Sequence, residues 1–152
     1  MTAPALELVA TVLADVGEPL EVGALATGVR RVVPITGGTV SGPLLTGRVL
    51  PGGADVQLLR SDTETELEAR YLLESDAGEL VSVHNSALRV ASVEDSAHLR
   101  RGEPVDPARV YFRGAVRLET AAPRLARLNS HLYLGVGTRY PRGVRIELFE
   151  VQ

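Results

Sequence analysis

The residues from Glu66 to Glu74 alternate between apolar and charged side chains at every position except Leu72, and this pattern constrains the fold most. The apolar positions are Leu67, Ala69, Tyr71 and Leu73, and the charged ones are Glu66, Glu68, Arg70 and Glu74. A period of two residues is typical of a β-strand with one face buried and the other in water. Asp76-Ala77-Gly78 then predicts a turn, and Leu80–Leu88 a returning strand. The sequence therefore predicts an antiparallel hairpin.

Further strand-like runs lie on both sides of this hairpin. They are expected over Leu6–Val16, Val29–Ile35, Thr39–Leu59, Val110–Thr120, Leu132–Thr138 and Val144–Val151. Thr36-Gly37-Gly38 is expected to end the second run, because glycine permits the positive φ of a tight turn. Pro43 and Pro51-Gly52-Gly53 interrupt the third run and are interpreted as bulges or corners. Ser92 predicts the N-cap of one short helix that ends at Gly102.

These elements predict an all-β fold, namely a closed antiparallel β-barrel of about eight strands with one short helix. A barrel is preferred to a sandwich, because glycine and proline corners let a sheet coil and closure removes its exposed edges. A chain of 152 residues is long enough for one domain with a real core, so a single domain over residues 1–152 is expected.

The composition excludes several classes of chemistry. The chain has no cysteine, and all sixteen basic residues are arginine, so thiolate nucleophiles and lysine Schiff bases are excluded. A net charge of −3 gives no field for nucleic acid and no polybasic patch for a membrane. The N-terminus lacks the pattern of a signal peptide, so a cytoplasmic location is expected. The histidines show no ligand-like spacing, so no metal site is predicted.

Two neighbouring strands supply the first candidate site residues. Tyr71 and Leu67 share the apolar face of one strand, so both side chains are expected in the lumen. Core packing, with the hydroxyl satisfied locally, is the more common explanation for a single tyrosine on such a face. Asn85 continues the inward alternation of the next strand, where a polar amide needs a partner from the backbone, water or a ligand. His84 is a candidate acid or base.

The strand from Tyr111 to Thr120 leaves one question open. Strict alternation would send Phe112 inward and both Arg113 and Glu119 outward, whereas a bulge at Gly114 would turn Arg113 into the lumen as an anion-holding group. Arg127 and Asn129 share this ambiguity, because their segment could be a strand or a helical turn. The glycines of Gly135-Val-Gly137 are expected to relieve crowding in a curved strand, since no helix follows as in a dinucleotide fingerprint.

Several short motifs of this chain resemble the DUF3237 family, also called UPF0311. They are Val49-Leu-Pro-Gly-Gly-Ala-Asp55, Ala69-Arg-Tyr71, Asn85, Gly102-Glu-Pro-Val-Asp-Pro107, Tyr111-Phe-Arg113, Glu119-Thr120, Ala122-Pro-Arg124, Leu128-Asn129 and Gly135-x-Gly137. The resemblance runs from about residue 6 to the C-terminus. It implies a small closed barrel similar in architecture to allene oxide cyclase-like barrels, and it implies no particular reaction.

The chain departs from the family pattern at several aromatic positions. The resemblance implies a tryptophan where Val56 stands and Tyr-x-Trp where Leu125-Ala-Arg127 stands. Deleting aromatic rings from a lumen opens volume unless the neighbours collapse inward. We therefore expect a roomier, aliphatic pocket that suits a bulky apolar ligand.

These observations favour a cofactor-independent cyclase or isomerase of specialised metabolism that acts on an apolar small molecule in the lumen. Shape and a few hydrogen-bonding groups are sufficient for ring closure, pericyclic or acid/base-assisted addition chemistry. The expected roles are Tyr71 as acid, His84 or Glu119 as base, Arg113 as anion holder, and Asn85 and Asn129 as orienting amides. The substrate site is expected to include Val56, Leu67, Phe112, Arg127 and Tyr133 as well.

Two other classes of function remain open. A non-catalytic protein could bind a hydrophobic small molecule in the same lumen. A structural or interaction module could form a homodimer around a solid barrel.

Overall fold

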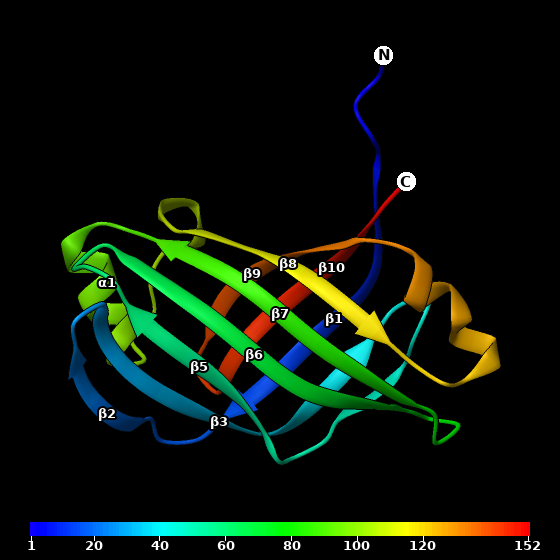
Figure 1. Cartoon of the computed structure of the whole chain (residues 1–152), viewed down its shortest axis with the longest axis horizontal. Coiled ribbons are helices and arrows are strands. Elements are labelled where there is room, and N and C mark those ends of the chain that lie inside the picture. Colours follow the sequence, from blue (N-terminus) through cyan, green and yellow to red (C-terminus); the bar gives the residue numbers. More distant parts are fainter.

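Ten strands form one continuous antiparallel sheet that closes on itself in the computed structural model, which describes residues 1–152 (Figure 1). The strands are β1 (Leu6–Val16), β2 (Leu20–Leu25), β3 (Gly28–Ser41), β4 (Gly47–Val49), β5 (Gly53–Leu59), β6 (Glu64–Ser75), β7 (Leu80–Val90), β8 (Tyr111–Glu119), β9 (Tyr133–Tyr140) and β10 (Gly143–Val151). The helices are α1 (Val93–Arg100) and the short 3-10 helices η1 (Pro107–Arg109) and η2 (Pro123–Ser130).

Closure depends on β1, which pairs with both β10 and β3. Val12, for example, lies opposite Ile146 on one side and Val40 on the other. β4 and β5 share one position between β3 and β6, and β2 follows β3 beyond the end of β1. The ring therefore has eight positions, which confirms the predicted closed barrel.

The predicted hairpin and helix are also present. β6 pairs with β7 without a register shift, and Tyr71 lies opposite Val83. The Oγ of Ser92 accepts a hydrogen bond from the backbone N–H of Asp95 at 3.0 Å, as expected of an N-cap. The segment with two interpretations, from Arg124 to Asn129, lies within helix η2.

The structure differs from the prediction at two places in the first third of the chain. Gly37 and Gly38 do not end a strand, because β3 continues through them to Ser41. Gly38 has φ +132°, and a Cβ atom there would lie 1.9 Å from the carbonyl oxygen of Leu13. This glycine therefore permits the close approach of β1 at the point of closure. Strand β2 was not predicted, because its large apolar side chains, including Leu20 and Val22, are exposed.

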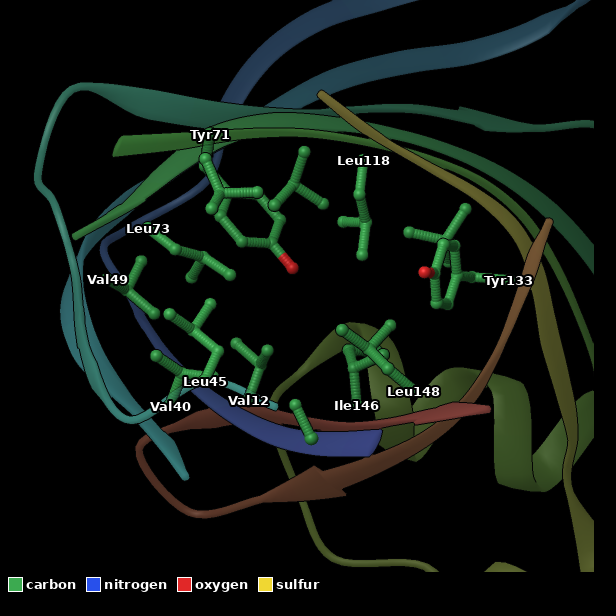
Figure 2. Close-up of a cluster of buried hydrophobic side chains, with 14 of the residues drawn as sticks. Val12, Val40, Leu45, Val49, Tyr71, Leu73, Leu118, Tyr133, Ile146 and Leu148 are labelled. Atoms are coloured by element: carbon green, nitrogen blue, oxygen red, sulfur yellow. The ribbon is translucent and has the colours of Figure 1, made fainter. Parts of the chain in front are cut away.

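The half of the barrel near η2 is filled by apolar side chains. Figure 2 shows the labelled residues of this core converging from opposite sides of the ring. The most deeply buried include Val12, Val40, Leu73, Leu125, Leu128 and Leu148. This packing contradicts the expectation of a roomy lumen. None of the helices has the length or apolar character needed to cross a membrane.

Candidate functional site

An apolar cavity lies inside the other half of the barrel, towards α1. Its free volume is about 50 Å³. Its walls are largely aliphatic and include Val33, Ile35, Leu67, Val144 and Ile146, together with the ring of Phe112. A space of this size admits a small group of atoms, since one water molecule occupies about 10–15 Å³ on a comparable measure. The cavity is therefore suited to the reacting part of a molecule.

A chain of hydrogen bonds runs along one wall of this cavity from a cation to a carboxyl group. Arg31 donates from Nε to Oε1 of Gln57 at 2.8 Å, and Gln57 donates from Nε2 to Oδ2 of Asp55 at 2.8 Å. The other oxygen of Asp55, Oδ1, is buried and has no partner. Burial raises the pKa of the Asp55 carboxyl, and the hydrogen bond from Gln57 opposes this shift. The site thus contains a buried carboxyl group with one free oxygen.

Two further polar atoms without partners line the same cavity. The hydroxyl of Tyr71 is buried and unpartnered, and Figure 2 shows it pointing into the interior. Burial, with a contribution from the Asp55 charge, raises the pKa of Tyr71, so its hydroxyl stays neutral and can donate. The Oδ1 of Asn85 is the other unpartnered atom. Gly114 makes room for it, because a Cβ atom there would lie 2.0 Å from that oxygen.

Arginine side chains lie where the cavity opens at the α1 end. Arg89 lies near Phe112, with its guanidinium carbon 5.8 Å from the centre of the ring. Burial, followed by repulsion from Arg31, lowers the pKa of Arg89 to about 10. Arg139 lines both the cavity and an open hollow of about 760 Å³ outside it. The hollow lies between the β1–β2 link, the end of α1 and the β9–β10 turn. It shares Val16, Val33 and Arg139 with the lining of the cavity, so it borders the cavity as an entrance hollow.

Four of the residues predicted for the site line this cavity: Leu67, Tyr71, Asn85 and Phe112. Four others, Val56, His84, Arg113 and Glu119, do not line it. The pairing of β8 with β7 has no register shift, so Gly114 makes no bulge and both Arg113 and Glu119 are exposed. His84 lies outside and contacts Glu68, with 2.8 Å between Nε2 and Oε2. The structure therefore places these four side chains outside the cavity, and for Arg113 and Glu119 it confirms the outward orientation that strict alternation predicts.

The remaining three predicted residues lie at the opposite end of the barrel. Tyr133 donates its hydroxyl to Glu150 at 3.0 Å, and Arg127 donates from Nε to the same carboxylate at 3.1 Å. The hydrogen bond from Arg127 contributes most to lowering the pKa of Glu150 to about 2. Asn129 accepts from the N–H of Thr120 at 2.8 Å and donates to its carbonyl oxygen at 2.9 Å. These contacts attach η2 and its neighbours to the barrel, away from the cavity.

The sequence prediction missed Asp55, Gln57, Arg89 and Arg139. The inward alternation through Asn85 and Ala87 reaches Arg89, so a strand extended past Leu88 would have placed this arginine in the lumen. Asp55 was harder to place, because Pro51-Gly52-Gly53 hides the phase of the strand that follows it.

Comparison with known proteins gives matches over nearly the whole chain. Residues 4–151 match the family described as "Protein of unknown function (DUF3237)". A UPF0311 protein of Rhodopseudomonas palustris strain TIE-1 is 43% identical over 150 residues, which cover 97% of this chain and 98% of the relative. A UPF0311 protein of Clostridium acetobutylicum is 33% identical over 146 residues, which cover 95% of this chain and 92% of that protein.

Solved structures agree with these sequence matches. The crystal structure of a conserved protein of unknown function from R. palustris has a TM-score of 0.95 at 40% identity, with 100% of both chains covered. A β-barrel like protein from Acinetobacter baumannii has a TM-score of 0.86 at 33% identity, with 100% and 98% covered. An enzyme from Penicillium herquei has a TM-score of 0.75 at 19% identity, with 100% and 97% covered, and shares the fold alone. With these matches the chain belongs to the DUF3237 family, whose curated relatives carry the name UPF0311.

Proposed function

We propose that this protein is a cofactor-independent isomerase or cyclase that moves a proton within a small substrate. The main support is that Asp55 Oδ1, the Tyr71 hydroxyl and Asn85 Oδ1 are all buried, unpartnered and in one apolar cavity. Buried polar atoms in proteins almost always have partners, so three free ones at one cavity favour a bound molecule that completes their hydrogen bonds. A carboxyl group with a raised pKa is also typical of functional sites.

In this proposal Asp55 is the base. Its Oδ1 takes a proton from a carbon or a hydroxyl of the substrate, and its raised pKa makes the carboxylate a stronger base than an exposed aspartate. Tyr71 donates a hydrogen bond to the substrate oxygen on which negative charge develops. Asn85 accepts from a donor on the substrate and fixes its orientation.

The proton then returns from Asp55 to a different atom of the same molecule. In an isomerisation it goes to another carbon of a conjugated system. In a ring closure it leaves the attacking hydroxyl and is added to the carbon beside the new C–O bond. Neither reaction changes the number of atoms or electrons in the substrate, and both use only groups that the chain supplies. The Penicillium herquei neighbour, described as an enzyme, shares this fold, but the proposal depends on the cavity.

Solvent deuterium exchange tests this proposal. The protein is incubated in D2O with a panel of small β,γ-unsaturated ketones and hydroxy-enones, and the recovered compounds are analysed by mass spectrometry and NMR. Deuterium incorporation or isomer formation is expected, with a decrease of about 10²–10⁴-fold in Asp55→Asn. Asp62→Asn is the matched control, because Asp62 is exposed in the turn before β6. Exchange at the buffer rate, or Asp55→Asn as active as the unaltered protein, would refute the assignment.

A binding protein is the second candidate. The observation that favours it is the small free volume, about 50 Å³, which leaves a bound molecule little freedom to change shape. In the same experiment a compound that binds in the cavity and is recovered without deuterium or rearrangement would support this function instead.

A further inference from the structure

Arg89 and Arg139 are two inward-facing cations that form no ion pair in the protein. Arg89 is only 7% exposed and forms no ion pair, and the Nε of Arg139 is buried without a hydrogen-bond partner. They come from β7 and β9, on either side of β8, and both line the cavity. Two guanidinium groups are therefore held at one cavity without an ion-pair partner.

This arrangement costs folding free energy as it stands. A guanidinium stays charged at neutral pH even when burial lowers the pKa, and Arg89, at about 10, is no exception. A buried charge is normally paired, because removing it from water without a partner is expensive. The nearby Arg31 adds repulsion to both side chains. A bound anion would remove both penalties.

Asp55 does not serve as that anion. Its charge acts on Arg89, but the two side chains form no ion pair, and Gln57 occupies one of its oxygens. Burial raises the pKa of Asp55 despite the opposing charges of Arg89 and Arg31, so these arginines stabilise its carboxylate only weakly. One such carboxyl cannot neutralise two arginines.

The entrance hollow has the same excess of positive charge. Five arginines line it (Arg31, Arg100, Arg101, Arg139 and Arg142), against two glutamates, Glu18 and Glu21. Arg31 approaches Glu21 at 3.7 Å, Arg101 is paired with Glu103 outside the lining, and Arg142 approaches Asp15 at 3.8 Å. Arg100 and Arg139 have no carboxylate partner. The chain as a whole has a net charge of −3, so this positive region is local. Such a region attracts anions from solution to the entrance.

We propose that the substrate carries a carboxylate, that Arg89 and Arg139 bind this group where the cavity opens, and that the apolar remainder extends towards Tyr71. This inference rests on the proposed function and adds the substrate class. A planar carboxylate matches the fork of a guanidinium. A carboxylate has only two oxygens that need hydrogen-bond donors, whereas a phosphoryl group has three. The smaller number suits a cavity whose other walls, such as Phe112 and Val144, are apolar. The substrate is then an amphipathic acid.

Binding of simple aromatic probes tests the inference without any turnover. Benzoate, its neutral analogue benzamide, and phenyl phosphate are titrated into the protein by isothermal calorimetry at low salt. Benzoate is expected to bind at least 10-fold more tightly than benzamide or phenyl phosphate. Arg89→Met and Arg139→Gln are each expected to weaken benzoate binding at least 10-fold. The second variant is at a half-buried position, so it tests the site independently of the deeply buried Arg89. Arg145→Gln, on the outer face of β10, is the control and should bind benzoate normally.

Each other result overturns the inference. Benzamide binding as tightly as benzoate would show that the charge is not recognised, and tighter binding of phenyl phosphate would assign a phosphoryl substrate. Benzoate binding that is unchanged in both cavity variants, or weakened equally in Arg145→Gln, would place the anion elsewhere.

Asp55→Asn separates this inference from the proposed function. This variant should retain or strengthen benzoate binding, because a negative charge has been removed, while it loses proton transfer. If Asp55→Asn keeps full turnover, the proposed function fails and the benzoate results still stand. If benzoate does not bind but deuterium exchange depends on Asp55, the carboxylate assignment fails alone.

Discussion

At the residue scale, Asp55 and Arg89 are both placed where water cannot solvate them fully. Each would be more stable as a neutral side chain, since burial is the largest contribution to the pKa shift of both. Buried ionisable residues that lower stability and lie together at one cavity are typical of functional sites.

The first prediction concerns the pH dependence of stability. The pKa of Asp55 is higher in the folded state than in the unfolded state. The protonated carboxyl therefore favours the folded state, and this stabilisation is fully present at low pH. This contribution is lost as the pH rises through the raised pKa. Asp55→Asn, which stays neutral, should therefore be more stable than the unaltered protein at pH 7, by on the order of 1–3 kcal/mol. Thermal unfolding measured between pH 4 and 8 checks this, because each kcal/mol should raise the Tm by about 2–4 °C. The advantage of Asp55→Asn should grow with pH, and Asp62→Asn should show none.

A second prediction concerns the space that Gly114 leaves for Asn85. Gly114→Ala places a methyl group against Asn85 Oδ1 and should destabilise the protein by about 1–3 kcal/mol. The cost should be smaller when Asn85 is already alanine, because the colliding amide is then absent. Urea unfolding of the two single variants and the double variant gives the coupling. Equal costs in both backgrounds would contradict the contact.

At the element scale, the strands that could be predicted are those with one buried face and one exposed face. The pair β6 and β7 could be predicted, because each has one buried and one exposed face and so writes a period of two into the sequence. β2 could not, because it covers no core and its apolar residues are exposed. The turn before β5 hid the phase of this strand, so nothing in the local pattern pointed to Asp55, and the family resemblance pointed to Val56 instead. Asp55 and Gln57 were therefore missed, because the local sequence pattern of β5 does not show which of its side chains face the cavity.

The third prediction concerns the seam between β1 and β3. Gly38→Ala combines an unfavourable φ of +132° with a collision against the backbone of Leu13. Gly52→Ala is the matched control, because Gly52 has φ +105° but open space around it. Gly52→Ala should cost about 1–3 kcal/mol from backbone strain alone. Gly38→Ala should cost clearly more, because β1 must shift. The free energies of unfolding in urea give the comparison, and equal values would contradict the role of Gly38 in closure.

At the scale of the whole molecule, the barrel has two unlike halves, and Figure 1 shows α1 at one end of the barrel. The half near η2 is a packed apolar core, and the half near α1 holds the cavity, the arginines and the entrance hollow. Only β2 lies outside the closed ring, since it pairs with β3 alone.

The fourth prediction follows from this asymmetry. Amides of β2 should exchange with deuterium much faster than those of β6 and β7, because an edge strand without core contacts can open locally. Hydrogen exchange followed by mass spectrometry measures both regions in one sample, so β6 and β7 serve as the internal reference. Equal protection of β2 and β7 would mean that β2 is covered by something absent from the single chain.

The division of the barrel into two halves also bears on how such a scaffold can diversify. Substitutions around the cavity leave the apolar half intact, and that half holds the most deeply buried aliphatic side chains. A mutant library confined to positions such as Gln57, Ala69 and Ala87 would therefore retain folded members at high frequency. A library of equal size at Val12, Leu73 and Leu148 would lose most of them. Selection can thus exchange one chemistry for another in this barrel without rebuilding what keeps it folded.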